Sequence, residues 1–484
     1  MKNIMRWEQA NYKKAILPEH QGNPLIESLP PKVEDNDVID KFCNYPELAF
    51  HVRSSLDFLV REEYLARIDE LRQPLPEYID CFRAVERAIK SGYSTKNPFT
   101  PSTAQYLHYP VDDRPNIKPR TGYFVPKGKG ITLIGDSGVG KTSMLEQVLN
   151  YFPHVIEHHD YKGKALGFKY QVVWIKVDCP RNSSVRELCE EILFDLDSAT
   201  RQERTTPETT ISKLLIQIEQ KIKSSHLGIL VIDEMQNLQF KRTGGENNLL
   251  KFLHHLVNKL GVSLFFCANP PFDDSLALTL KNARRAESGG TIFMKPLQRH
   301  ELGWEAFVAE LWDLQWTNVE TLLSDELNDK MYDLSLGNID MACRIYCEAQ
   351  RLVIGTGDES ITIAVLECAY PIACSLSSRT SEVIEARHSL VLPTRKFKDK
   401  SAVAIVNVRT KKTLIIGDYN RPHHPEFEVR LRDLHLKERL LELIEDPDLV
   451  QRGFKHMRDV GVICDDPFTF KERLNEGVVM YRRE

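Results

Sequence analysis

The chain has 484 residues, a formal net charge of −5 and a pI near 6.3. At about 150 residues per domain this length predicts about three domains, and a hydrophobic content of 42% suffices for packed cores. The charge excludes a globally basic protein, so contact with nucleic acid would come from local basic patches. Ten cysteines without a C-x-x-C pair indicate reduced thiols, and no apolar run approaches about 18 residues, which disfavours a membrane span. We therefore expect a cytoplasmic protein with no membrane partner.

Residues 1–120 are expected to form a mainly helical module that docks to a partner. Helical patterns cover 37–42, 54–70 and 78–91. The proline-dotted stretch 23–31 is expected to be an extended docking segment, because proline cannot continue a helix. Nothing in this region predicts a chemistry of its own.

The stretch 130–143 carries the strongest functional signal. An apolar run breaks at Gly135, and a helical pattern follows directly. From Gly135 to Thr142 the spacing is G-x-x-x-x-G-K-T, in which glycines let backbone N–H groups cradle phosphate at a helix N-terminus. The alternative, a glycine-rich turn with a stray lysine, fits the flanking strand and helix poorly. The residues predicted to bind nucleotide are Gly135, Asp136, Ser137, Gly138, Val139, Gly140, Lys141, Thr142 and Ser143.

Two of these residues have predicted roles in catalysis and metal binding. Lys141 would reach the β- and γ-phosphates of ATP, and the Thr142 hydroxyl would bind Mg²⁺. A second strand, 227–233, ends in Asp233 and Glu234 about 90 residues later, which is the usual ATPase spacing. Asp233 would join the Mg²⁺ shell and Glu234 would polarise a water molecule against the γ-phosphate. The Asp-Glu pair favours a hydrolysing ATPase over a small GTPase.

Residues 121–296 are predicted to be the ATPase core. Strands alternate with helices there, which predicts a parallel sheet with helices on both faces. One predicted helix has Ser183 as its N-cap. The other predicted strands are 171–178, 262–267 and 291–294, and the predicted helices are 183–198, 209–224 and 246–260.

Three polar residues after the Asp-Glu strand are further candidates for catalysis. Asn269 ends the next strand, where ATPases with an additional strand place a residue that orients the attacking water; the alternative is an Asn-Pro turn. Arg284 and Arg285 follow in a polar loop, where an arginine could reach the γ-phosphate of a neighbouring subunit. An ordinary solvated arginine pair is the alternative.

The remaining chain divides into two predicted regions. Residues 297–375 contain helical patterns only and are expected to form an all-α lid over the nucleotide. Arg344 in this lid is a candidate for phosphate contact, with a surface arginine as the alternative. Residues 376–484 are expected to hold a basic tether and an amphipathic, partner-binding tail. The basic run 395–412 would contact phosphate backbone or form a solvated face.

These motifs resemble a known family. The core resembles AAA+ ATPases, and its Gly-Asp-Ser-Gly-Val-Gly-Lys-Thr, Leu-Val-Ile-Asp-Glu-Met-Gln-Asn-Leu, Arg-Thr-Gly-Gly and Asn-Ala-Arg-Arg-Ala stretches look like those of TnsC-type regulators of heteromeric DNA transposition. Stretches 23–31, 92–98 and 323–326 extend the resemblance over roughly residues 20–370. Residues 267–270, Cys-Ala-Asn-Pro, depart from the Gly-Thr-Pro more usual in the family, which leaves the role of Asn269 open.

The resemblance implies an α/β AAA+ P-loop core with an all-α lid, a helical N-terminal module and a C-terminal extension. It implies an ATP- and Mg²⁺-dependent ring or filament on double-stranded DNA of any sequence, at the bacterial nucleoid. A target selector would place this assembly, transposase subunits would engage it, and ATP hydrolysis would disassemble it. Arg284 or Arg285 would act as a finger in trans, and Lys241 and Arg242, with Lys281 as a weaker addition, would contact DNA.

Two other functions stay open. A STAND-type signalling switch would bind nucleotide without DNA, but such proteins usually carry long repeat arrays, and only about a hundred non-repeating residues follow the predicted lid. A helicase or clamp-loader-like motor would also bind DNA, but the sequence offers no strand-separating element.

Overall fold

The structure is a computed structural model, and it describes residues 5–46, 57–108, 124–180, 184–237, 256–270, 288–374, 403–406 and 413–417. The chain forms two units, residues 1–374 and residues 375–484.

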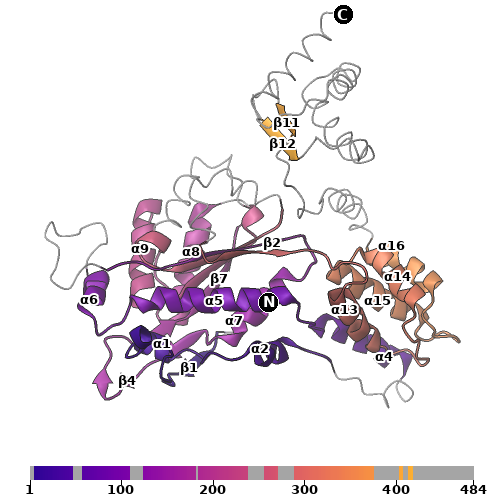
Figure 1. Ribbon diagram of the computed structural model, residues 1–484, viewed down its shortest axis with the longest axis horizontal. Helices are drawn as coiled ribbons and strands as arrows, with labels where there is room; N and C mark the ends of the chain where they lie inside the picture. The colour runs from indigo at the N-terminus through magenta and orange to yellow at the C-terminus, as the bar shows by residue number, and fades with distance from the viewer. Residues whose placement is uncertain are drawn as a thin grey trace, which may run out of the picture. The chain divides into compact units, whose positions relative to one another are not determined.

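A five-stranded parallel sheet is the centre of the first unit (Figure 1). Its strands follow the order β10-β2-β9-β8-β7, so β9 lies between the P-loop strand β2 and the Asp-Glu strand β8. Every residue of β2, β8 and β9 is buried, as a parallel sheet covered on both faces requires. The predicted P-loop α/β fold is confirmed. The strands are β2 (Gly130–Gly135), β7 (Trp174–Asp178), β8 (Ile229–Asp233), β9 (Ser263–Ala268) and β10 (Gly290–Met294).

Helices cover the two faces of this sheet with separate hydrophobic cores (Figure 1). α5 (Pro76–Ser94) and α7 (Lys141–Tyr151) pack on one face, and α8 (Val185–Ala199) and α9 (Ile211–Ser224) pack on the other. The N-cap of α8 is Ser184, whose side chain accepts the N–H of Glu187, so the predicted N-cap was wrong by one residue.

The strand predicted at 171–178 is two strands in two sheets. β6 (Tyr170–Val172) pairs antiparallel with β3 (Val155–Glu157), which also pairs with β1 (Trp7–Gln9), whereas β7 joins the central sheet. Val173 connects the two sheets, because its N–H donates to the carbonyl of His154 next to β3 and its carbonyl accepts the N–H of Ile229 in β8. A mostly apolar run does not reveal such a change of strand partner. A short hairpin, β4 (Asp160–Tyr161) and β5 (Lys164–Ala165), follows β3.

The stretch 23–31 is buried from residue 23 to residue 29 and is partly helical, so the prediction of an extended docking segment was wrong. It contains α1 (Pro24–Glu27), whose N-cap Asn23 accepts the N–H of Leu25 and donates its amide to the carbonyl of Tyr93 at 2.9 Å. Proline at the first helical position is compatible with a helix, because that N–H would have no intrahelical partner. α2 (Asp35–Phe42) and α6 (Pro101–His108) complete this part of the chain.

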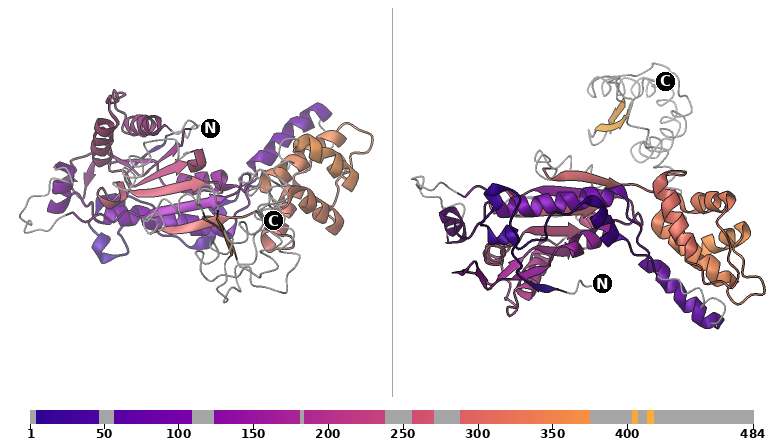
Figure 2. Two further views of the ribbon diagram at one scale, coloured as in Figure 1. Left: turned by 90° about the horizontal axis from the view of Figure 1, so that it is seen from above. Right: turned by 60° about the horizontal axis from the view of Figure 1, so that its bottom comes forward.

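The lid is all-α, and a segment from the N-terminal region packs into it. Figure 2 shows α4 (Phe58–Tyr64) alongside the lid helices, and the following 3₁₀ helix, Leu65–Glu70, adds Leu65 and Ile68 to the lid core. Residues 1–120 therefore contribute both to the sheet core, through α5, and to the lid. The lid helices are α13 (Leu302–Asp313), α14 (Asp325–Ser335), α15 (Ile339–Val353) and α16 (Ile363–Ala373).

A buried ion pair joins α4 to the lid. Nη1 and Nη2 of Arg61 lie 2.6 and 2.8 Å from the two carboxylate oxygens of Glu359, and each side chain is less than 5% exposed. Changing Arg61 to Ala leaves the Glu359 charge buried, so we expect the free energy of unfolding to fall by about 3 kcal/mol. Chemical denaturation measures this loss. Arg351→Ala is the control, because Arg351 forms its ion pairs at the exposed surface of the same lid.

The pair also predicts a pH dependence. The Arg61 hydrogen bonds lower the pKa of Glu359 to about 2. A lowered carboxyl pKa gives a stabilisation that is present above the ordinary pKa and is lost as the pH falls through the folded-state value. The difference between wild type and Arg61→Ala should therefore shrink in acid. An equal difference at neutral and strongly acidic pH contradicts this role for the pair.

In the second unit, β11 (Val403–Val406) pairs antiparallel with β12 (Thr413–Gly417). β11 falls in the predicted basic run 395–412, and β12 begins directly after it. The predicted amphipathic tail lies outside the described residues. Among the described helices, none combines the length and apolar character that a membrane crossing needs.

Candidate active site

The P-loop lies between β2 and α7 and has the backbone that phosphate binding requires. Gly138 and Gly140 adopt φ values of +83° and +91°, a region that side chains disfavour. Such turns direct successive backbone N–H groups into one concavity, and α7 adds its positive N-terminal end. Val139 is buried and anchors the loop to the core below it.

Lys141 is held inside this loop. Its side chain is 9% exposed, and its ammonium donates to the carbonyl of Asp136 at 2.6 Å. Burial lowers the pKa of Lys141, and the nearby carboxylates of Asp233, Glu234 and Asp136 oppose that shift. The ammonium is therefore poorly solvated and close to both carboxylates of the Asp-Glu pair, so an anionic phosphate would stabilise it.

Asp233 is 3% exposed, and both of its carboxylate oxygens are engaged. Oδ1 accepts the backbone N–H of Glu234 at 2.8 Å, and Oδ2 lies 3.1 Å from the ammonium of Lys176. The sequence analysis missed Lys176, which lies on the neighbouring strand β7 and is only 11% exposed. Lys176 lies between buried apolar residues of β7, which is a sign that its side chain is largely enclosed. The sequence pattern does not show which residue it pairs with.

Glu234 is exposed and has φ +56°, a strained value for a residue with a side chain. Its Oε2 accepts a hydrogen bond from Nε2 of Gln236. Oε1 of Gln236 accepts the backbone N–H of Asn269 at 3.0 Å. Gln236, which the sequence analysis did not single out, thus joins the predicted general base to the end of β9, where Asn269 lies half-buried.

The lid contacts the P-loop directly. Asn338, the N-cap of α15, donates its amide to the carbonyl of Ser137 at 2.9 Å, and the N–H of Asp340 donates to the carbonyl of Gly138 at 3.0 Å. A Cβ at Gly138 would lie 2.5 Å from Oδ1 of Asn338, so a larger residue here would be strained in φ and would displace the Asn338 side chain from its present position. The helical pattern of residues 297–375 gave no sign of this P-loop contact.

Arg344 contacts lid atoms. Its guanidinium lies 2.8 Å from Asp340 and donates to the carbonyl of Ala373 at 2.8 Å. Its predicted phosphate contact stays a prediction. The loop candidates Lys241, Arg242, Lys281, Arg284 and Arg285 lie outside the described residues.

These residues fit ATP and Mg²⁺. The glycine cradle and the buried ammonium suit the phosphates, and Thr142 is an exposed residue in the first turn of α7. Asp233 is a buried carboxylate that requires a positive charge nearby, and the Lys176 ammonium provides that charge in this structure. Thr142 and Asp233 would hold the metal, which would neutralise charge that develops on the phosphates. In the predicted roles, Lys141 would hold the triphosphate and Glu234 would orient a water molecule.

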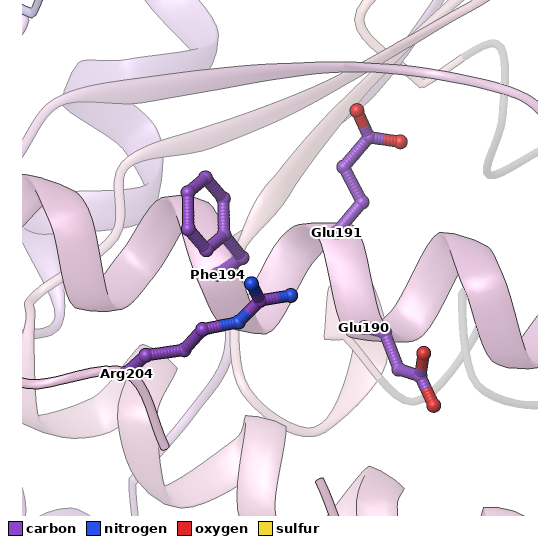
Figure 3. Close-up of a pocket in the computed structure, with 4 residues that line it drawn as sticks. All are labelled: Glu190, Glu191, Phe194 and Arg204. Atoms are coloured by element: carbon purple, nitrogen blue, oxygen red, sulfur yellow. The ribbon is translucent and has the colours of Figure 1, made fainter. Parts of the chain in front are cut away.

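A separate hollow of about 290 Å³ lies beside α8 (Figure 3). Its lining consists of Glu190, Glu191, Phe194 and Arg204. The guanidinium carbon of Arg204 lies 4.9 Å from the centre of the Phe194 ring, and Glu190 pairs with Arg186 on its own helix. None of the predicted nucleotide-binding residues lines it.

Comparison with known proteins identifies the central domain. Residues 127–276 match the family model of an AAA domain. No curated protein sequence matches the chain. The matched segment holds the P-loop, the Asp-Glu strand and Asn269. The chain therefore carries an AAA-type P-loop ATPase domain, and it is an ATPase.

Among solved structures, the chain is similar to ORC1 of Aeropyrum pernix in complex with DNA, at 16% identity and a TM-score of 0.35, over 65% of this chain and 89% of that one. It is similar to a Walker-type ATPase of Pyrococcus abyssi at 16% identity and a TM-score of 0.34, over 54% and 72% of the two chains. It is also similar to Aeropyrum pernix ORC2 in ADPNP–ADP complexes, at 12% identity and a TM-score of 0.33, over 54% and 67%.

Proposed function

We propose that the protein is an ATP-dependent regulator of DNA transposition. In this proposal it oligomerises on double-stranded DNA, connects a target selector to transposase subunits, and is disassembled by ATP hydrolysis with Mg²⁺. The AAA domain supplies the ATPase, and the TnsC-like stretches of the sequence supply the reason to choose transposition among the functions of such ATPases.

The observation that carries the proposal is the packing of two TnsC-like stretches against each other. The amide of Asn23 donates to the carbonyl of Tyr93 at 2.9 Å, and the amide of Asn97 donates to the carbonyl of Gly22 at 3.1 Å. Tyr93 is fully buried, and its hydroxyl donates to the carbonyl of His226, just before β8. Stretches 23–31 and 92–98 thus form one structural unit on the ATPase domain, which supports a shared architecture over a chance match of short motifs.

DNA and subunit contacts are assigned from the sequence. Lys241 and Arg242, in a loop with Thr243 and two glycines, suit contact with phosphates of any sequence, because cations and backbone N–H groups do not read bases. Arg284 or Arg285 would complete the active site of a neighbouring subunit, and Asn269 would orient the attacking water. Oligomerisation would then be required for fast hydrolysis.

Imaging of the purified protein tests this proposal. With a non-hydrolysable ATP analogue and duplex DNA of arbitrary sequence, we expect rings or filaments, and we expect none when either component is omitted. DNA affinity in the same conditions should fall steeply with salt, as phosphate contacts require. Adding the cognate transposase should accelerate ATP hydrolysis.

Two results would contradict the proposal. Monomers in all conditions, despite nucleotide binding, would favour a STAND-type switch that does not bind DNA. ATP-driven strand separation or movement along DNA would favour a motor. In either case the ATPase assignment would stand and the transposition role would not.

A further inference from the structure

Lys176 is the one cation among the described residues within ion-pair distance of Asp233. Its ammonium lies 3.1 Å from Oδ2 of Asp233, 3.7 Å from Oδ1 of Asp178 and 4.0 Å from Oε1 of Glu146. The Asp233 side chain is 4% exposed, whereas those of Asp178 and Glu146 are 69% and 39% exposed. The largely buried Lys176 therefore lies between the buried carboxylate of Asp233 and the exposed carboxylates of Asp178 and Glu146, which water stabilises.

This arrangement has an electrostatic consequence. A buried carboxylate is costly unless a positive charge or hydrogen bonds compensate it, and Lys176 with the Glu234 N–H does so when no ligand is bound. A divalent cation at Asp233 would add positive charge next to a fixed ammonium, and the repulsion in this poorly solvated site would oppose its binding. ATP phosphates bring the negative charge that offsets this repulsion.

We propose that Lys176 is an internal counter-ion that makes metal binding at Asp233 depend on bound nucleotide. Without nucleotide it neutralises Asp233 and disfavours a free metal ion. When the metal enters with the nucleotide, the ammonium is retained by Asp178 and Glu146, which lie on β7 and α7 beside it. Lys176 is a positioning residue, and this role rests on the proposed assignment of Asp233 to the metal shell.

The test measures metal binding rather than activity. Mn²⁺ serves as the probe, and paramagnetic resonance reports the free ion in titrations of the full chain without nucleotide. Removing a unit charge a few ångströms from the site should strengthen Mn²⁺ binding at least about tenfold in Lys176→Gln. Lys176→Arg keeps the charge and should behave like wild type. Adding Asp233→Asn to Lys176→Gln should abolish the gain.

Reciprocal coupling gives a second readout. In Lys176→Gln the ratio of ATP affinity with saturating Mg²⁺ to ATP affinity in EDTA should fall, because the variant strengthens metal binding mainly without nucleotide, and metal and nucleotide must affect each other equally. If Lys176→Gln does not fold, Glu146→Gln combined with Asp178→Asn tests the same idea from the exposed side. That variant removes the alternative partners of the ammonium, so Mn²⁺ affinity in the presence of ADP should fall about threefold or more, by the same electrostatics.

The outcomes separate this proposal from the assignment on which it rests. If Asp233→Asn alone changes the metal dependence of ATP binding but Lys176→Gln does not, the metal site stands and the counter-ion role is wrong. If Asp233→Asn has no effect on that dependence, Asp233 is outside the metal shell and both statements fail. Equal Mn²⁺ affinity in wild type and in the folded Lys176 or Glu146/Asp178 variants overturns the proposal directly.

Discussion

Replacing Lys141 by Ala is expected to weaken ATP binding about 100-fold and to abolish measurable hydrolysis. A hydrogen bond between a charged donor and a phosphate contributes roughly 1.5–3 kcal/mol, and the low exposure of Lys141 places it at the upper end of that range. Its one described hydrogen bond, to the carbonyl of Asp136, is internal to the loop and would be exchanged for a phosphate. Equilibrium binding of a fluorescent ATP analogue and steady-state phosphate release measure the two effects.

The same variant should leave the fold intact. A buried ammonium whose pKa is lowered by desolvation destabilises the ligand-free protein, so its removal should not reduce the melting temperature without ATP. Stabilisation by added ATP should become small at ATP concentrations below the weakened Kd, because ligand stabilisation depends on the ratio of free ligand to Kd. Lys127→Ala, at an exposed lysine before β2, is the matched control and should change neither quantity. ATP binding by Lys141→Ala at wild-type strength would remove Lys141 from the phosphate site.

Features of the fold that depend only on residues adjacent in the chain could be predicted from the sequence. The β2 strand, the glycines and α7 follow one another within a few residues, so local pattern predicts both the elements and the loop between them. The lid helices α14 and α15 are amphipathic, and three lid helices begin after Ser324, Asn338 and Thr362, whose side chains accept backbone N–H groups as N-caps. Such signals require no knowledge of distant partners.

Contacts between distant segments could not be predicted in this way. The partner of Asn338 lies about 200 residues earlier in the P-loop, and the partner of Lys176 lies on another strand. The N-terminal region shows the same limit, because its helices have clear patterns but their periodicity does not say that α5 covers the sheet while α4 joins the lid. The arginine and DNA-contacting candidates stay predictions from the sequence.

Changing Glu234 to Gln is expected to slow ATP hydrolysis by about 10²- to 10⁴-fold while ATP binding is retained, because a general base contributes a factor of that size. Glutamine has nearly the same shape, so the left-handed backbone at this residue and its N–H bond to Asp233 should persist. If hydrolysis disassembles the protein from DNA, the variant should stay assembled far longer than wild type after excess competitor DNA is added. Single-turnover hydrolysis and the lifetime of the assembly on DNA measure the two effects separately.

The link through Gln236 sharpens this test. Because Gln236 joins Glu234 to the backbone of Asn269, Gln236→Ala should also slow hydrolysis, but less than Glu234→Gln does, since the base is misplaced rather than removed. Glu203→Gln makes the same change at an exposed residue that is not among the predicted site residues, and it should have no effect on the rate of hydrolysis. If Glu234→Gln hydrolyses ATP at the wild-type rate, another residue activates the water. If hydrolysis stops but the assembly lifetime is unchanged, turnover does not drive disassembly, and that step of the proposed function is wrong.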